Sequence, residues 1–191
     1  MNRKMTLIVA VLCLAAGGAL IADAVWIQTK AAAANIMIRS AWIDAKAGGA
    51  SPRPWPWADT WPVARLRAPA LGVDQIVLAG ASGRTLAFGP AHVSGSARPN
   101  ETGNTVIGGH RDTHFRFLRD VGAGSRLILT SADGREVSYT VTGTSVVRAE
   151  AQLPVAASSR KLSLVTCWPF DGLTSASSDR YVVTAIADEP A

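Results

Sequence analysis

The chain has 191 residues, of which 48% are hydrophobic and 17% charged, and its formal net charge is +5. This length suits one domain with accessory segments, and it is enough to bury a core without disulfides or a structural metal. The basic residues are scattered, with adjacent pairs only at Arg3-Lys4 and Arg160-Lys161, whereas nucleic-acid-binding domains gather them into a stripe. We therefore expect no nucleic-acid partner, and we attribute the charge to solubility or to attraction towards anionic lipid or wall polymers.

An apolar stretch near the N-terminus predicts a membrane anchor over residues 1–27. Residues 5–22 carry no charge and are just long enough to cross a bilayer, which needs about 17–25 residues. Arg3 and Lys4 precede the stretch and favour a cytoplasmic N-terminus. The alternative is a cleaved signal peptide, because Ala22-Asp23-Ala24 fits the small-x-small cleavage pattern. We favour a single-pass anchor in the cytoplasmic (inner) membrane, and both alternatives place the domain on the periplasmic or extracytoplasmic side.

Two accessory segments are expected between the anchor and the domain. Residues 28–50 are rich in alanine and free of proline, which predicts a juxtamembrane helix that ends at Gly48-Gly49. Residues 51–62 hold four prolines and three tryptophans and predict an extended linker, because proline removes backbone donors. Tryptophan is costly to leave in water, so we expect the three to pack on the domain or to lie near lipid headgroups.

From residue 63 onward, short apolar runs separated by turn residues predict a β domain. Asp133-Gly134 is a strong hairpin signal, and the alternation of Val137, Tyr139 and Val141 with polar residues predicts one buried face. One short helical turn is expected around residues 113–120. Many short strands without alternating helices are typical of a closed barrel or a sandwich. The expected strands cover residues 63–67, 73–79, 85–88, 105–108, 126–130, 136–148, 162–166 and 181–187.

The two cysteines lie in different surroundings. Cys13 falls inside the apolar anchor, so Cys167 is left without an intramolecular disulfide partner. Cys167 ends an apolar run, and Pro169 prevents the strand from continuing, which places the thiol at the rim of a sheet. Free cysteines are often buried and inert, so position alone leaves both a packing role and a reactive thiol open.

A histidine and an arginine are expected near the same rim. His110 follows Gly108-Gly109, where a strand gives way to a loop. Arg180 opens the last strand, and if that strand runs antiparallel to the one ending at Cys167, both residues fall at one edge. A loop histidine bonded to backbone and an ordinary surface arginine remain the plainer alternatives.

A metal site is a further alternative that we do not favour. His114 stands four residues after His110, a spacing that lets two histidines share a helical face. The glycines before His110 argue against a helix, and a third ligand would have to come from Asp112, His92 or the Cys167 thiol. We expect no metal or other cofactor, and we expect His114 to be structural or peripheral.

Three segments resemble the signature regions of sortases. They are residues 103–115 around His110, residues 164–170 around Cys167, and residues 179–183, which contain Arg180. The order of the segments is also that of the family, and the resemblance runs from residue 63 to residue 187. It implies a closed eight-stranded β-barrel, which we assign to residues 63–191. The Pro/Trp-rich preface and the short chain are most like the sortase class found in Gram-negative bacteria.

The resemblance also implies roles for individual residues. Cys167 is expected to be the nucleophile, His110 the general acid/base, and Arg180 a donor to substrate and oxyanion. Thr166 and Trp168 flank the thiol and are assigned to substrate binding, although Trp168 is bulky and could simply cover the barrel end. The family cuts a C-terminal sorting motif similar to Leu-Pro-x-Thr-Gly and joins it to an amine through a thioacyl-enzyme. The implied partners are an exported protein bearing such a motif, an amine acceptor and the lipid bilayer.

Three other readings remain open. A papain-like peptidase would also use cysteine and histidine, but its cysteine signature is absent. A peptidoglycan cross-linking cysteine transpeptidase would carry a His-Gly-Cys cluster, whereas Thr166 precedes Cys167 here. A non-catalytic membrane-tethered binding module would make the grouping of Cys167, His110 and Arg180 a coincidence.

Overall fold

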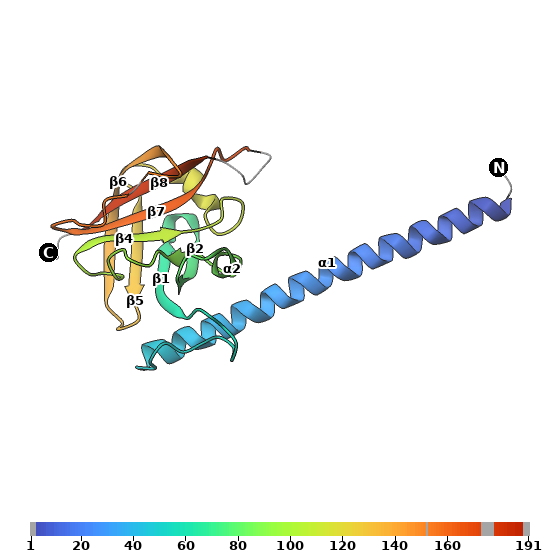
Figure 1. The fold of residues 1–191 in the computed structure, drawn as a ribbon, viewed down its shortest axis with the longest axis horizontal. Helices are drawn as coiled ribbons and strands as arrows, with labels where there is room; N and C mark the ends of the chain where they lie inside the picture. Colours follow the sequence, from blue (N-terminus) through green and yellow to red (C-terminus); the bar gives the residue numbers. More distant parts are fainter. Residues whose placement is uncertain (1–2, 152, 173–177, 189–191) are drawn as a thin grey trace. The chain divides into compact units, whose positions relative to one another are not determined.

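The computed structural model describes residues 3–151, 153–172 and 178–188 and is drawn in Figure 1. The chain forms two compact units, residues 1–36 and residues 37–191. The first unit is helical, and the second contains the end of that helix and the whole β domain.

A single helix, α1, runs from Arg3 to Lys46 and covers both the expected anchor and most of the expected juxtamembrane helix. It contains an 18-residue apolar window, none of it buried, that is long enough to cross a membrane. Length and composition alone do not distinguish such a helix from a signal sequence near the N-terminus. The helix ends just before Gly48, whose φ of +91° suits a glycine directly after a helix end.

The second unit is a closed barrel of eight strands, which confirms the fold expected from the resemblance. Around the barrel the strands follow the order β1-β2-β3-β4-β7-β8-β6-β5. In this closed order each strand has a hydrogen-bonded neighbour on both sides. The strands are β1 Pro62–Ala68, β2 Val73–Ala79, β3 Ala91–His92, β4 Gly103–Gly108, β5 Arg126–Ser131, β6 Glu136–Arg148, β7 Arg160–Trp168 and β8 Asp179–Ala187. The short helices are η1 Pro69–Leu71, α2 Gly83–Leu86 and η2 Arg116–Asp120.

One predicted strand is wrong. Residues 85–88 fall in and just after α2, because Ser82 caps that helix by accepting a hydrogen bond from Thr85 N at 3.2 Å. The remaining strand of the barrel is instead β3, which pairs in parallel with β2 and antiparallel with β4. With two residues, β3 is too short to show the alternation by which strands are recognised.

Alternation along the longer strands fills the barrel. In β1 every second residue, Ala64, Leu66 and Ala68, is buried. In β6 Tyr139 and Val141 are buried as predicted, and Val137 is partly buried against the same core. The hairpin at Asp133-Gly134 is confirmed, with Gly134 at φ +85°. Burying these apolar faces is the main favourable contribution to folding, at roughly 25 cal/mol per Å².

The three tryptophans of residues 51–62 behave differently from one another. Trp55 packs edge-on against Phe88 with ring centroids 4.9 Å apart, and Trp61 is partly buried. Trp57 is 82% exposed, because the chain turns where Ala58 N donates to Trp55 O, and Trp57 lies in that turn. Trp57 therefore does not pack on the domain, and for this residue the expected alternative, a place near lipid headgroups, stays a prediction.

Asn100 holds the segment ahead of β4 in place. It is fully buried with φ +66°, and its Nδ2 donates to Leu129 O at 3.0 Å and to Arg135 O at 2.9 Å. Its Oδ1 accepts from the Tyr139 hydroxyl at 3.1 Å. Burial, opposed by the charges of Arg160 and Arg135, raises the pKa of Tyr139 to about 12, so this hydroxyl stays a donor at neutral pH. The network ties the approach to β4 to the β5–β6 hairpin.

Candidate active site

Three neighbouring strands bring the predicted site residues together. In Figure 1, β7 lies between β4 and β8, and it pairs in parallel with the former and antiparallel with the latter. In the two registers Gly108 is opposite Val165 and Cys167 is opposite Arg180. The ends of β4 and β7 and the start of β8 therefore meet at one edge of the barrel.

Cys167 lies on the outer side of β7. Leu162, Leu164 and Thr166 are buried on the core side, and successive residues of a strand point to opposite faces. The Cys167 side chain is partly exposed. Directly opposite residues on antiparallel strands have Cβ atoms about 4.5–5.5 Å apart, so Arg180 is the immediate neighbour of the thiol. The shared edge inferred from chain direction is confirmed, while the chemical roles of the two residues stay predictions.

His110 leaves β4 beside the same edge. The last bonds between the two strands run from Gly109 N to Val165 O at 3.1 Å and from the Thr166 hydroxyl to Gly109 O at 2.8 Å. Because His110 is the next residue, it projects from a backbone fixed to the residues just before Cys167. Its side chain is exposed, and its role as acid and base stays a prediction.

Gly109 is required at this position by close packing. A Cβ on Gly109 would lie 2.7 Å from the ring of Phe115, which is fully buried in the core. Phe115 N in turn donates to His110 O at 2.9 Å. The backbone on either side of His110 is thus held by β7, by the Phe115 ring and by the turn that follows.

Thr166 and Trp168 are placed for structural roles in the free protein. The Thr166 side chain is buried with its hydroxyl bound to Gly109 O. Trp168 stacks on Tyr181 with centroids 5.4 Å apart and meets Phe170 edge-on at 5.6 Å, so the indole covers the end of the barrel. Contact of either side chain with substrate stays a prediction.

His114 lies beside β2, where Gln75 Nε2 donates to its carbonyl oxygen at 2.7 Å. Burial, and then the nearby charge of His110, lower the pKa of His114, so its ring is neutral at neutral pH. Within residues 3–151, 153–172 and 178–188, no three His, Cys, Asp or Glu side chains are grouped to hold a metal ion. His92 instead bonds through Nε2 to Ala97 O and the Ser96 hydroxyl, both at 3.0 Å.

Sequence reasoning missed one residue beside this edge. Arg111 follows His110, and its side chain is only 4% exposed. The guanidinium donates to two carbonyl oxygens of the segment after Cys167. An arginine in a loop resembles any surface arginine, so the sequence carries no signal for this arrangement.

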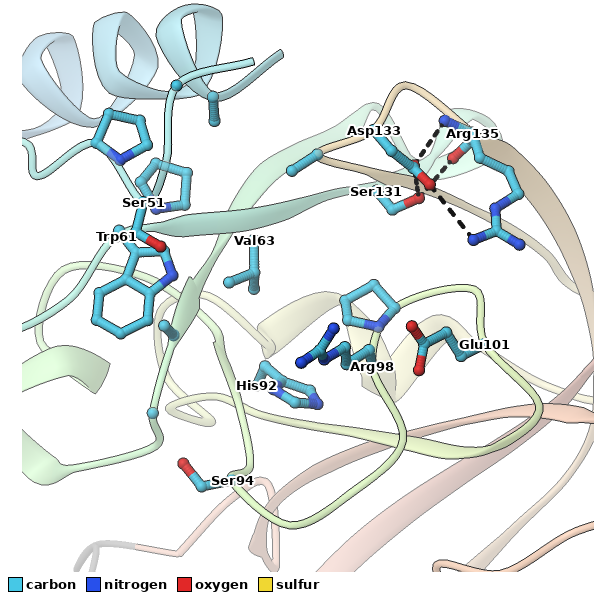
Figure 2. Close-up of a pocket in the computed structure, with 18 of the residues that line it drawn as sticks. Ser51, Trp61, Val63, His92, Ser94, Arg98, Glu101, Ser131, Asp133 and Arg135 are labelled. Carbon is cyan, nitrogen blue, oxygen red and sulfur yellow. Dashed lines mark hydrogen bonds and ion pairs between the residues drawn. The ribbon is translucent and has the colours of Figure 1, made fainter.

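Two cavities differ in their relation to the site. A groove of about 440 Å³ has Arg180 as one of its lining residues, and most of its other residues are apolar. A larger cavity of about 780 Å³ is lined by none of Cys167, His110 and Arg180. In Figure 2 the polar groups on one side of that larger cavity satisfy each other, with Asp133 bound to Ser131 and Arg135. The smaller groove is therefore the better candidate for substrate.

The sequence matches the sortase domain over residues 66–188, which is more than half of the chain. The chain belongs to the sortase family. Sortase D of Bacillus subtilis (strain 168) is 30% identical over 120 residues, which cover 62% of this chain and 60% of that protein. The match thus spans less than two thirds of that relative.

Solved sortase structures share the barrel. Sortase A from Corynebacterium diphtheriae superimposes with a TM-score of 0.62 at 27% identity, covering 71% of this chain and 64% of that one. A Clostridium perfringens sortase D5 transpeptidase gives a TM-score of 0.59 at 23% identity, covering 67% and 79% of the two chains. These comparisons support the family and do not support the narrower assignment to the Gram-negative class.

The packing around Gly109 predicts a specific sensitivity. In Gly109→Ala, the new methyl must displace Phe115 or shift His110, which we expect to lower the free energy of unfolding by about 1–3 kcal/mol. Gly108→Ala is the matched control, because no atom lies within 4 Å of a Cβ at that position. Urea unfolding measures the difference, and equal stability of the two variants would contradict the packing described for His110.

Proposed function

We propose that this sortase is a membrane-anchored transpeptidase that cleaves a C-terminal sorting motif of an exported protein and transfers the acyl group to an amine. The observation that carries the proposal is the register that sets Cys167 opposite Arg180, with His110 one residue beyond the last β4–β7 bond. A thiol, an imidazole and a guanidinium at one exposed edge are the groups that acyl transfer requires.

The proposed chemistry begins at the sulfur. The Cys167 thiolate attacks the carbonyl carbon of the scissile peptide bond, since the thiolate is the nucleophilic form. Arg180 and backbone N–H groups donate to the developing oxyanion. His110 gives a proton to the leaving amine as the C–N bond breaks, which leaves a thioester on Cys167 and a neutral imidazole.

The second half of the reaction regenerates the enzyme. An incoming amine attacks the thioester carbonyl and loses a proton to the neutral His110. The C–S bond then breaks, the new amide leaves, and the site returns to a thiolate beside an imidazolium. Water in place of the amine would give hydrolysis, so the balance between transfer and hydrolysis depends on access to the same edge.

The groove beside Arg180 supports an apolar peptide as the acyl donor. Val165 and Val182 are register partners on the Cys167 face of the sheet, and both line the groove. The segment after β6 also lines the groove, with Ala149, Leu153 and Val155. A leucine side chain buried there would contribute roughly 1.5–3 kcal/mol to binding. A sorting motif similar to Leu-Pro-x-Thr-Gly has such a residue upstream of its cleaved bond.

A solved relative supports this substrate class. The Clostridium perfringens sortase C structure carries a C-terminal cell wall sorting motif and superimposes with a TM-score of 0.60 at 17% identity, covering 85% of this chain and 91% of that one. At that identity the likeness shows the shared barrel alone. We extend the substrate class to this chain on the groove and on family membership.

Anchoring to a membrane suits the proposed reaction. If α1 spans the cytoplasmic membrane and the barrel lies on its outer side, enzyme and exported substrate share one surface. Confinement of this kind raises the effective concentration of one partner for the other without any new contact.

Replacing Cys167 distinguishes a sortase transpeptidase from a non-catalytic binding module. We expect Cys167→Ala to abolish exchange of a sorting-motif peptide with an added amine, because no other group of the site can form the thioester. Cys13→Ala, which removes the other cysteine, is the matched control and should react like the wild type. Product formation is followed by mass spectrometry of the peptide. Exchange that survives in Cys167→Ala would overturn the mechanism.

The anchor proposal has its own test. We expect the expressed protein to stay with the membrane after carbonate washing and to keep residues 5–22, because α1 serves as a retained span. Intact mass and N-terminal peptide mapping decide the point. A soluble chain that begins at Ala24 or Val25 would instead establish a cleaved signal peptide.

A further inference from the structure

Arg111 is buried in a way that demands explanation. Arginine is rarely buried fully unless its charge is paired, and the carboxylate beside it, Asp112, is itself 64% exposed. Arg111 Nε and Nη2 bond the two Asp112 oxygens at 2.8 and 3.0 Å. The hydrogen bond to Asp112 holds the pKa of Arg111 above its ordinary value, and the charge of Cys167 acts in the same direction. The guanidinium therefore stays charged.

The other two bonds of Arg111 cross to the strand that carries the thiol. Nη1 donates to Pro169 O at 2.6 Å and Nη2 donates to Gly172 O at 2.8 Å. Gly172 N also donates to Pro169 O at 3.2 Å, so these residues form a closed turn directly after β7. Arg111 is the residue after His110, and the turn that it binds begins at Pro169, two residues after Cys167.

This link lies where the sheet no longer connects the two segments. The β4–β7 ladder ends with the bonds between Gly109 and residues 165–166. His110 and Cys167 both stand past that point, so the ladder alone leaves their separation adjustable. Arg111 connects the segment after His110 to the turn after Cys167. The two residues are therefore held by the β4–β7 ladder on one side and by Arg111 on the other.

The turn is shaped to receive the guanidinium. A Cβ on Gly172 would lie 2.8 Å from Arg111 Nη1, so an alanine at this position would displace that end of the guanidinium. Two carbonyl oxygens and a carboxylate are bound by one planar group, which matches the fixed fork of arginine. A lysine would keep the positive charge, but its single ammonium group lacks the planar set of N–H donors that binds these three partners.

We propose that Arg111 is a positioning residue of the transpeptidation, holding the turn after Cys167 against the segment after His110. The proposal rests on the function assigned above to Cys167 and His110. Displacements of about 1 Å in such a pair can lower rates by as much as 10²-fold.

The test compares Arg111→Lys and Arg111→Met with Arg116→Lys and Arg116→Met in the full-length Cys13→Ala protein, whose sole cysteine is Cys167. Arg116 is an exposed arginine five residues on and serves as the matched control. We expect both Arg111 variants to lose about 10- to 100-fold in kcat for the sorting-motif peptide with little change in KM. The Arg116 variants should behave like the parent.

Two readouts do not depend on turnover. The first is the rate of Cys167 alkylation by iodoacetamide at one fixed pH, which should change in both Arg111 variants because the turn directly after the thiol loses its bonds to the guanidinium. The second is hydrogen exchange over residues 168–172, which should become faster in both Arg111 variants. Parental kcat in a folded Arg111→Met overturns the proposal. A loss of stability that leaves the alkylation rate and the exchange unchanged also overturns it, because it would mark a merely structural role.

A second variant covers the case in which Arg111→Met does not fold. Gly172→Ala pushes on Nη1 without removing the arginine, and Gly122→Ala, where a Cβ meets nothing within 4 Å, is its control. We expect Gly172→Ala, but not Gly122→Ala, to lower kcat and to speed hydrogen exchange over residues 168–172. Equal kcat and equal exchange in these two variants would contradict the proposal. If the parent protein forms no thioacyl-enzyme at all, the proposed function fails instead. The alkylation and exchange comparisons then still decide whether Arg111 holds the turn.

Discussion

The parallel pairing of β4 with β7 is the constraint on which the candidate site depends. Parallel strands need a long connection, and here η2, β5 and β6 lie between the two in sequence. The pairing ends with the Thr166 hydroxyl bound to Gly109 O at 2.8 Å. A slip of one residue would turn Cys167 from the outer face to the core and separate it from His110. The register is fixed because every second residue of β7, namely Leu162, Leu164 and Thr166, is buried in the barrel core.

The closed barrel makes this edge useful for chemistry. Its core is filled by side chains, so substrate must approach an outer face, and the groove near Arg180 lies on such a face. The thiol stands on a strand instead of a mobile loop, with Trp168 and Tyr181 packed over the barrel end behind it. Preorganised groups of this kind stabilise developing charge without having to reorganise during the reaction.

Strong local patterns made much of the fold predictable. The expected strands 73–79 and 136–148 match β2 and β6 in their bounds, because alternation and turn residues mark them clearly. Pro169 and Gly109 located the edge by ending their strands. Helix α2 was missed because its Ser82 cap depends on local geometry, and Arg111 because its partners are about 60 residues away in sequence. Such contacts form only once the β4–β7 register exists.

The claim that Cys167 forms a thioacyl-enzyme is tested most directly by trapping that species. The full-length protein is incubated with a sorting-motif peptide in the absence of an added amine, quenched in acid, digested and mapped by mass spectrometry. We expect an added mass equal to the peptide portion up to the cleaved bond, located on Cys167 and released by an amine. An unmodified Cys167 with cleaved peptide in solution, or the adduct on Cys13, would contradict it.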